Sequence, residues 1–292
     1  MRRKNPSGCS LLLRAQICIF LVVFCRSLPA WQQQTFADVE KSIATLLPEQ
    51  RVYERFRFWI TQIPPDQMGP DTDERYVAYL IQNGFSRADA EEQIKTVDRV
   101  QARAEVERWN IILTSEKPAF NTQPNEFLVD MVKDMKSGAA LDVGMGQGRN
   151  AIWLAQQGWD VTGFDPAEKA VALAQKNAAA AGVKIHTEIT RTEEFDFGDR
   201  RWDLILLSYA GGRGLTEQIQ RSLRPGGVLI VESFHRDATK GTSIGGGVVF
   251  DTGDLPKLFP GLRVVRYEEP VTRADFGQQM VRVVRYCARR PE

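Results

Sequence analysis

The sequence predicts an α/β fold: a Rossmann-like sheet of seven strands with helices on both faces, preceded by a helical N-terminal extension. Short apolar segments alternate with helix-forming segments from about residue 139 onward. A parallel sheet needs this order, because each crossover between its strands runs through a helix. A polar stretch without a glycine-rich loop precedes them. At 292 residues, the chain can hold one α/β domain of ordinary size and an extension.

Strands are expected where apolar and β-branched residues follow one another between turn signals. The expected strands are 139–143, 161–164, 183–189, 203–208, 228–234, 262–267 and 280–286. The expected helices are 150–157, 168–181 and 216–223. Segment 203–208 is nearly all apolar, as a strand covered on both faces should be. Residues 224–227 are expected to turn into the fifth strand, and the last two strands should form an antiparallel pair joined by a turn near Asp275.

Two helices are expected in the extension. Residues 73–81 read as a helix that stops at Asn83 and Gly84, and Ser86 with Asp89 resembles a capping box that opens a long helix toward Val106. A helical hairpin follows from this pattern. It either packs on or covers the next domain, or it is a module that binds a partner or a membrane surface.

The most informative segment is 140–150. An apolar strand ends at the acidic Asp142, the chain turns through Gly144, Gly146 and Gly148, and a helix begins. This arrangement holds a nucleoside ligand at the carboxyl end of a strand. A dinucleotide fingerprint has its third glycine one residue later, where this chain has Arg149. The early glycine therefore disfavours a nicotinamide-dependent oxidoreductase.

The acidic residues around this loop indicate the ligand. Asp142 would be a poor neighbour for a phosphate, but it suits a ligand that carries an ammonium and a sulfonium. S-adenosylmethionine is such a ligand, and its ribose hydroxyls need a carboxylate at the end of the next strand. Asp165 supplies one about twenty residues beyond the loop. The sequence therefore predicts S-adenosylmethionine as the cofactor; the alternative is a glycine-rich turn beside an incidental aspartate.

At these residues the sequence resembles the class I S-adenosylmethionine-dependent methyltransferases. Residues 146–155, Gly-Gln-Gly-Arg-Asn-Ala-Ile-Trp-Leu-Ala, and 158–161, Gly-Trp-Asp-Val, are similar to the tellurite-resistance (TehB-type) branch, which lies near the thiopurine methyltransferases. The resemblance extends from about Glu107 to the C-terminus. It implies a methyltransferase sheet and transfer of a methyl group by in-line displacement to a small-molecule acceptor, a thiol or a soft chalcogen.

The cofactor-binding residues are expected in and after the loop. Alternate glycines let the backbone approach the methionine part of the cofactor, where a β-carbon would collide with it. Arg149 is expected to pair with the cofactor carboxylate or an anionic acceptor, or else to face solvent as an ordinary helix residue. Many class I enzymes place an aspartate on adenine after the third strand; here Glu193 is the expected contact, with Phe195 as an apolar cover. The expected cofactor-binding residues are Asp142, Gly144, Gly146, Gly148, Arg149, Asn150, Asp165, Glu193 and Ser208.

The expected catalytic residues are Tyr209 and His235. Ser208 and Tyr209 end the fourth strand on the ligand side. His235 follows the fifth strand and could act as a base or orient the acceptor, because an imidazole titrates near neutral pH. Transfer to a soft nucleophile, however, depends mostly on alignment and desolvation. His186 lies within the third strand and is interpreted as structural, and Asp203 is expected to cap structure.

Two further segments could cover this site. The resemblance implies that residues just before the first strand cover the cofactor, which makes Trp109, Phe120 and Asn121 candidates; the two aromatic residues could equally be ordinary core residues. Residues 241–247 are expected to form a loop over the pocket, with a plain surface turn as the alternative.

Charge and residue counts exclude some classes of function. Lys and Arg total 38 against 37 Asp and Glu, so there is no basic excess to hold nucleic acid. Two histidines in the whole chain give no metal-binding cluster. A nucleoside-binding module without turnover stays an alternative to an enzyme. The sequence indicates neither the acceptor nor an oligomeric state.

The first thirty residues read as a targeting segment. Arg2, Arg3 and Lys4 form a basic start, residues 17–25 are apolar, and 27–30 is a plausible cleavage stretch. A signal peptide is the first interpretation, a short membrane anchor the second, and an over-extended start of a cytoplasmic protein the third. Export would require cofactor supplied across a membrane, which favours the cytoplasm, so the location stays open. The chain is thus predicted to divide into 1–30, 31–106 and 107–292.

Overall fold

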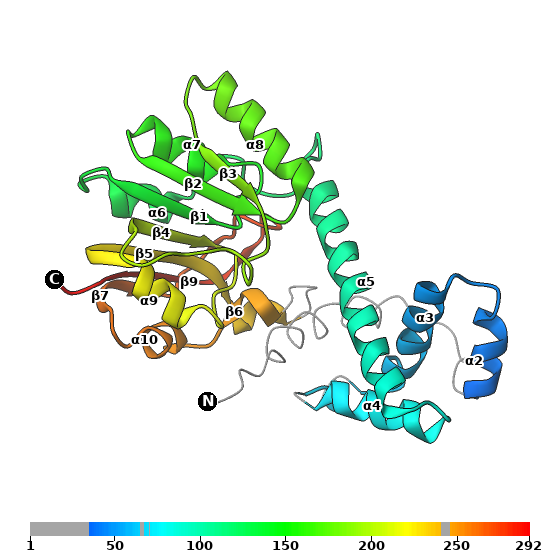
Figure 1. Cartoon of the computed structure of the whole chain (residues 1–292). Coiled ribbons are helices and arrows are strands. Elements are labelled where there is room, and N and C mark those ends of the chain that lie inside the picture. The colour runs from blue at the N-terminus through cyan, green and yellow to red at the C-terminus, as the bar shows by residue number, and fades with distance from the viewer. Residues whose placement is uncertain (1–34, 65–66, 70, 241–245) are drawn as a thin grey trace. The chain divides into compact units, whose positions relative to one another are not determined.

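The structure, a computed structural model, describes residues 35–64, 67–69, 71–240 and 246–292 (Figure 1). These residues fall into two compact units, and the chain passes from one to the other between Glu105 and Val106. The expected leader, 1–30, and most of the expected loop 241–247 lie outside the described residues. None of the described helices combines the length and the apolar character that crossing a bilayer requires.

The N-terminal unit is helical, as expected. Its helices are α2 (Phe36–Ile43), α3 (Pro48–Ile60), α4 (Thr72–Gln82) and the first part of α5 (Arg87–Leu113). They enclose an apolar core that includes Phe56, Trp59, Tyr76 and Leu80. Helix α4 ends where predicted, with Gly84 in the left-handed conformation (φ 93°). The predicted end of the next helix at Val106 is wrong: α5 continues to Leu113, because no glycine or proline interrupts it.

The second unit is built on one large sheet. Its strands are β1 (Ala139–Val143), β2 (Asp160–Asp165), β3 (His186–Ile189), β4 (Trp202–Ser208), β5 (Leu223–His235), β6 (Val249–Phe250), β7 (Arg263–Glu268), β8 (Val271–Arg273) and β9 (Met280–Arg289). Seven of them follow the order β3-β2-β1-β4-β5-β9-β7, while β6 pairs with β5 and β8 with β9. Strands β1 to β5 run parallel, and β9 is antiparallel to both β5 and β7. The predicted sheet and its final antiparallel pair are therefore confirmed.

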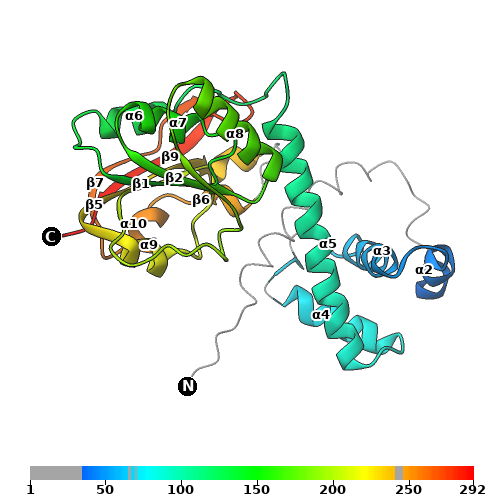
Figure 2. The same cartoon turned by 45° about the horizontal axis from the view of Figure 1, so that its top comes forward.

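Helices cover both faces of this sheet. They are α6 (Glu126–Val132), α7 (Arg149–Gln156), α8 (Glu168–Ala180), α9 (Thr216–Ser222) and α10 (Asp254–Leu258), with short 3-10 turns η3 (Arg236–Thr239) and η4 (Gly246–Val248). Figure 2 shows α6, α7 and α8 on one face and α9 and α10 on the other. Within β4, Leu204 and Leu206 pack toward the first face, whereas Ile205 and Leu207 pack toward the second. Successive strand residues point to opposite faces, so a strand buried on both reads as continuously apolar.

Three strand boundaries differ from the expectation by three residues or more, one of them the end of β9, which continues to Arg289 and not to Tyr286. Strand β3 begins at His186, three residues later than predicted. Strand β5 already begins at Leu223, which pairs with Trp202 before a register shift, so residues 224–227 are an irregularity within the strand and not a separate turn. The end of β9 holds this irregularity in the sheet, because Gly226 N donates to Arg290 O (3.0 Å) and Arg290 N donates to Gly227 O (2.8 Å).

Candidate cofactor and acceptor site

The carboxyl ends of β1, β2, β4 and β5 meet at one edge of the sheet, because these strands run parallel and in adjacent positions. The predicted site residues follow these ends. The glycine loop lies between β1 and α7, Asp165 ends β2, Ser208 ends β4 and His235 ends β5. A ligand site at this edge is what an open α/β sheet provides.

The backbone conformation and the packing of the loop also require glycine at these positions. Gly144, Gly146 and Gly148 all have a left-handed backbone, with φ of 66°, 55° and 83°. A β-carbon on Gly148 would lie 2.9 Å from the β-carbon of Ala174 in α8, and one on Gly146 would lie 3.1 Å from a methyl group of Leu113. The first contact explains why the third glycine comes early: it lets α7 begin close against α8.

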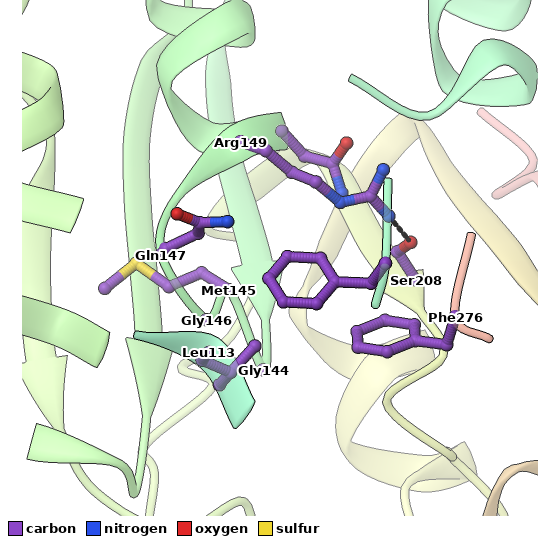
Figure 3. A pocket seen from close by; sticks show the side chains of 10 residues that line it. Leu113, Gly144, Met145, Gly146, Gln147, Arg149, Ser208 and Phe276 are labelled. Atoms are coloured by element: carbon purple, nitrogen blue, oxygen red, sulfur yellow. Dashed lines mark hydrogen bonds between the residues drawn. The ribbon is translucent and has the colours of Figure 1, made fainter. Parts of the chain in front are cut away.

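A pocket opens at this edge, between the glycine loop, the end of β4 and two segments from elsewhere in the chain (Figure 3). It is lined by Leu113, Phe120, Gly144, Met145, Gly146, Gln147, Arg149, Asn150, Ser208 and Phe276. The sequence placed five of these in the site, namely Gly144, Gly146, Arg149, Asn150 and Ser208, and proposed Phe120 as a cover. It missed Phe276, which lies in the turn between β8 and β9 and becomes a wall of the pocket only through the fold.

Asp142 lies buried behind the loop, with 1% of its surface exposed. Its Oδ2 has no hydrogen-bond partner among the described residues. Burial raises the pKa of this carboxyl to about 7, against the opposing influence of the Arg149 charge. A buried oxygen without a partner is unfavourable, and a cationic ligand group would satisfy it. The arrangement therefore fits a cofactor that brings an ammonium to this loop.

Asp165 connects the end of β2 to the glycine loop. Its Oδ2 accepts a hydrogen bond from Gly146 N (3.0 Å) and its Oδ1 accepts one from Ala167 N (2.8 Å). Burial raises the pKa of this carboxyl, and the two backbone donors oppose that effect. Each carboxylate oxygen can accept a second hydrogen bond, so both could still receive ribose hydroxyls. Asp165 thus fixes the loop and keeps the capacity expected of it.

The expected adenine contacts lie apart from the lining residues. Glu193 is exposed in a turn after β3, and no helix links β3 to β4 in this described segment. Phe195 packs in the core, where its ring stacks on Phe164 at 4.1 Å between centroids. Phe195 therefore has a partner in the core, and the adenine contacts expected of Glu193 and Phe195 stay predictions.

Arg149 is buried and joins three segments around the pocket. Its Nη2 donates to Asp275 Oδ2 (2.7 Å) and to Ser208 Oγ (3.1 Å), and its Nη1 donates to the carbonyl oxygen of Gln123 (2.8 Å). Only 8% of its side chain is exposed, so the alternative of a solvent-facing helix residue is wrong. Figure 3 shows its guanidinium reaching Ser208 across the pocket wall.

Tyr209 reaches the pocket only through a neighbour. Its backbone is left-handed (φ 57°), and its hydroxyl donates to Glu232 Oε1 (3.0 Å) and accepts from Asp275 N (3.3 Å). Burial and the two nearby carboxylates raise its pKa above the usual tyrosine range. The ring packs edge-on against Phe276, with 5.5 Å between centroids. A hydroxyl held in this way supports the pocket wall and is a poor base.

His235 lies outside the pocket lining, and its ring is engaged elsewhere. Its Nδ1 accepts a hydrogen bond from Asp237 N (3.1 Å) and so caps η3, while its Nε2 lies 3.0 Å from Thr252 Oγ1. Both ring nitrogens therefore serve local structure. Asp203 likewise behaves as predicted, because it accepts from Ala139 N at the opposite edge of the sheet.

His186 is exposed at the start of β3, 3.4 Å from the Asp160 carboxylate. The described residues contain no cluster of histidine, cysteine, aspartate and glutamate that could hold a metal ion.

Comparisons with known proteins agree with this geometry. Residues 140–227 match a family model described as a methyltransferase domain. A ubiquinone biosynthesis O-methyltransferase of Bordetella avium is 32% identical over 114 residues, which cover 38% of this chain and 46% of the relative. One from Azorhizobium caulinodans is 29% identical over 110 residues, covering 36% of this chain and 44% of the relative. The chain thus spans less than half the length of these curated relatives.

Two solved structures are similar to this chain, and the first of them shares its fold. The structure described as "Conversion of a Disulfide Bond into a Thioacetal Group during Echinomycin Biosynthesis" is 20% identical, with a TM-score of 0.53 over 64% of this chain and 93% of that chain. TehB from Haemophilus influenzae is 18% identical, with a TM-score of 0.49 over 57% of this chain and 62% of that one. Sheet order, glycine loop and matched family model together show that the chain carries a class I S-adenosylmethionine-dependent methyltransferase domain.

Proposed function

We propose that this protein transfers the methyl group of S-adenosylmethionine to a small thiol or another soft chalcogen nucleophile. The cofactor supplies an electrophilic methyl group on a sulfonium. In the transfer, the acceptor's sulfur lone pair forms the new bond to carbon as the carbon–sulfonium bond breaks, and that electron pair stays on S-adenosylhomocysteine. The acceptor's proton has to leave before or during this step.

The composition of the pocket lining supports this acceptor class. Among its ten residues, Arg149 is the single ionisable side chain, and Arg149 cannot accept a proton. The nearby Tyr209 hydroxyl is held by Glu232 and has a raised pKa. An acceptor that is partly deprotonated near neutral pH needs no base, and a thiol with a pKa of about 8.5 meets this condition.

The apolar wall of the pocket, formed by Leu113, Phe120 and Phe276, supports an acceptor with an apolar body. Phe120 and Phe276 stack with 5.3 Å between ring centroids and a 24° interplanar angle, and Leu113 lies beside them in the lining. Such a wall excludes water, and a desolvated thiolate is the more reactive nucleophile. We therefore expect an acceptor with a small apolar or planar body that carries the thiol.

A phenolic acceptor is the second candidate, because the curated relatives matched in part are O-methyltransferases. Phenols have a pKa of about 10, so a phenolic hydroxyl would need a proton acceptor at the pocket. The described lining offers none.

The test is the formation of S-adenosylhomocysteine by purified protein with aromatic and aliphatic thiols and with phenols matched to them in size. We expect turnover with thiols that increases with the fraction of thiolate as pH rises, and little with phenols. Turnover confined to phenols would contradict the proposed acceptor. Cofactor binding without turnover of any acceptor would favour a binding module instead.

A further inference from the structure

We propose that Asn125 and Asp275 are positioning residues for methyl transfer. They hold Arg149 and Phe276 in the wall of the pocket without themselves lining it. This inference rests on the proposed function only for its kinetic readout, because its structural readout does not need an acceptor.

Asn125 is the centre of a buried polar network, with 2% of its surface exposed. Its side-chain nitrogen donates to Glu232 Oε1 and to Asp275 Oδ2, both at 2.8 Å. Its side-chain oxygen accepts from Leu128 N (2.9 Å), which caps α6, and its backbone N donates to Asn150 Oδ1 (2.9 Å). The side-chain amide thus uses both its hydrogens and its oxygen, joining α6, β5 and the β8–β9 turn.

Asp275 connects this hydrogen-bond network to the pocket wall. Its Oδ2 accepts from Arg149 at 2.7 Å as well as from Asn125, and its Oδ1 accepts from Asn121 Nδ2 at 2.9 Å. Phe276 is the next residue in the chain and lines the pocket. Fixing the Asp275 side chain therefore fixes both Arg149 and the backbone that carries Phe276.

Backbone pairing reinforces the same contact. Asn121 N donates to Asp275 O (2.7 Å) and Gly277 N donates to Ala119 O (2.9 Å), so segment 119–121 lies along the β8–β9 turn. Phe120 and Phe276, the two rings of the wall, stand on these paired segments. Phe120 and Phe276 lie far apart in the sequence. Noncovalent contacts therefore have to hold the two rings beside each other.

Charge gives the network a second role. The Arg149 and Asp275 side chains are both more than nine-tenths buried and form one ion pair. Without Asp275, the guanidinium would remain buried and uncompensated, which is strongly unfavourable, so it would leave its present position. The Asp275 carboxylate is thus needed to keep the charged Arg149 side chain in this wall.

The test combines Asn125→Ala, Asp275→Asn and the double variant with measurements of kcat, acceptor KM and cofactor affinity. We expect each single variant to lower kcat about tenfold, as small misplacements of catalytic geometry do. The double variant should lose no more than the worse single variant, because both act through Arg149 and Phe276. The calorimetric Kd for S-adenosylmethionine is measured separately, and we expect Asp275→Asn to weaken cofactor binding as well, because the Arg149 that it releases lines the pocket beside the glycine loop.

Asp203→Asn is the matched control. It replaces by an amide a carboxylate that accepts a hydrogen bond from Ala139 N and forms an ion pair with Arg224, at the opposite edge of the same sheet. We expect this control to lower the thermal midpoint and leave kcat unchanged. If Asn125→Ala and Asp275→Asn behave in the same way, lowering only the thermal midpoint, their role is structural and the proposal fails. Multiplicative losses in the double variant would also contradict it.

Amide hydrogen exchange tests the positioning role without needing a methyl acceptor. In the Asn125→Ala variant, the amides of Asn121 and Gly277 should exchange faster than in wild type, while amides in β1 and β4 should not change. Unchanged exchange at Asn121 and Gly277 would overturn the positioning role. Failure of wild type to methylate any thiol would instead refute the proposed acceptor and leave this readout intact.

Discussion

At the scale of single residues, Asp142 shows how position changes chemistry. An aspartate at the end of an exposed strand would be ionised near neutral pH, whereas burial raises the pKa of this one to about 7. Its unpartnered Oδ2 makes the ionised form costly until a cation arrives. Cofactor binding and ionisation of Asp142 are therefore expected to be linked.

We predict that affinity for S-adenosylmethionine rises with pH up to about 7 and then levels off. Binding of the ammonium favours the ionised carboxylate, so below this pKa binding releases a proton and affinity changes by about tenfold per pH unit. Calorimetry between pH 5.5 and 8.5 measures this. The variant Asp142→Asn should bind weakly at all these pH values and lose the dependence; a wild type whose affinity is flat with pH would contradict the linkage.

The same pKa predicts a stability difference in the ligand-free protein. Because the folded-state pKa of Asp142 is raised, the folded chain holds this proton more tightly, so stability falls as pH rises from about 4 to about 7. The Asp142→Asn variant should therefore be more stable than wild type at pH 8, with the advantage gone near pH 4. Urea unfolding at the two pH values measures this. If Asp142→Asn lost the same stability at both pH values, ionisation of the buried Asp142 carboxyl would not destabilise the folded protein.

For His235 we predict that substitution changes stability and not turnover. Its ring caps η3 and contacts Thr252, and it does not line the pocket. His235→Asn preserves a capping side chain, so kcat should stay within about twofold of wild type. A loss of kcat by a hundredfold or more, with cofactor affinity unchanged, would restore the role of base that the sequence predicted for this histidine.

Residue chemistry could be predicted from the sequence where it depends on neighbours along the chain. The left-handed glycines follow directly after Asp142, which lies in β1, so their spacing along the chain was enough to predict the site. Asp275, Glu232 and Phe276 could not be found in this way, because their partners Arg149, Asn125 and Phe120 lie in distant segments. Glu232 left one signal, an acidic residue inside an otherwise apolar strand.

At the scale of elements, strand assignments succeeded where burial on both faces left a continuous apolar run, as in β4. The predicted start was wrong at β3, an edge strand with exposed residues, and at β5, where long-range pairing with β9 holds residues 224–227 in the sheet. Strand β8 has three residues and β6 two, which is too short for an alternating pattern to be visible.

The pairing of β5 with β9 gives an element-scale prediction. Arg285 in β9 donates from Nε to Glu232 Oε2 (2.6 Å), and the Glu232 side chain is 3% exposed. Removing one partner of a buried pair leaves the other uncompensated, so Arg285→Ala should lower the free energy of unfolding by about 3 kcal/mol. Denaturant unfolding measures the loss.

The control for this prediction is Lys133→Ala, which removes an ion pair with Asp130 in which both side chains are well exposed. Such pairs contribute about 0.5 kcal/mol or less. Equal losses in the two variants would mean that the β5–β9 pair is as well solvated as a surface pair.

At the scale of the whole molecule, the sequence predicted a helical segment followed by an α/β domain, and the division between Glu105 and Val106 falls within α5. The N-terminal unit has its own apolar core, so its stability need not depend on the cofactor. We therefore predict two thermal transitions. S-adenosylmethionine at about 100 times its Kd should stabilise one of them by about 2.7 kcal/mol and leave the other unchanged.

Scanning calorimetry with and without the cofactor measures this. A single transition that shifts as a whole would show that the two units unfold together. The expected leader over 1–30 stays a prediction as well, and N-terminal sequencing of the native protein distinguishes a cleaved signal peptide from a retained segment.

The central claim, that the glycine loop binds S-adenosylmethionine, is tested most directly by calorimetric titration of wild type, Gly146→Ala and Gly182→Ala. Both glycines have a left-handed backbone, so both substitutions add similar strain. Only at Gly146 would the new β-carbon meet the pocket, near Leu113, because nothing lies within 4 Å of one at Gly182. We predict that wild type and Gly182→Ala bind the cofactor and that Gly146→Ala binds at least tenfold more weakly. Equal binding by all three, or none by wild type, would contradict the account.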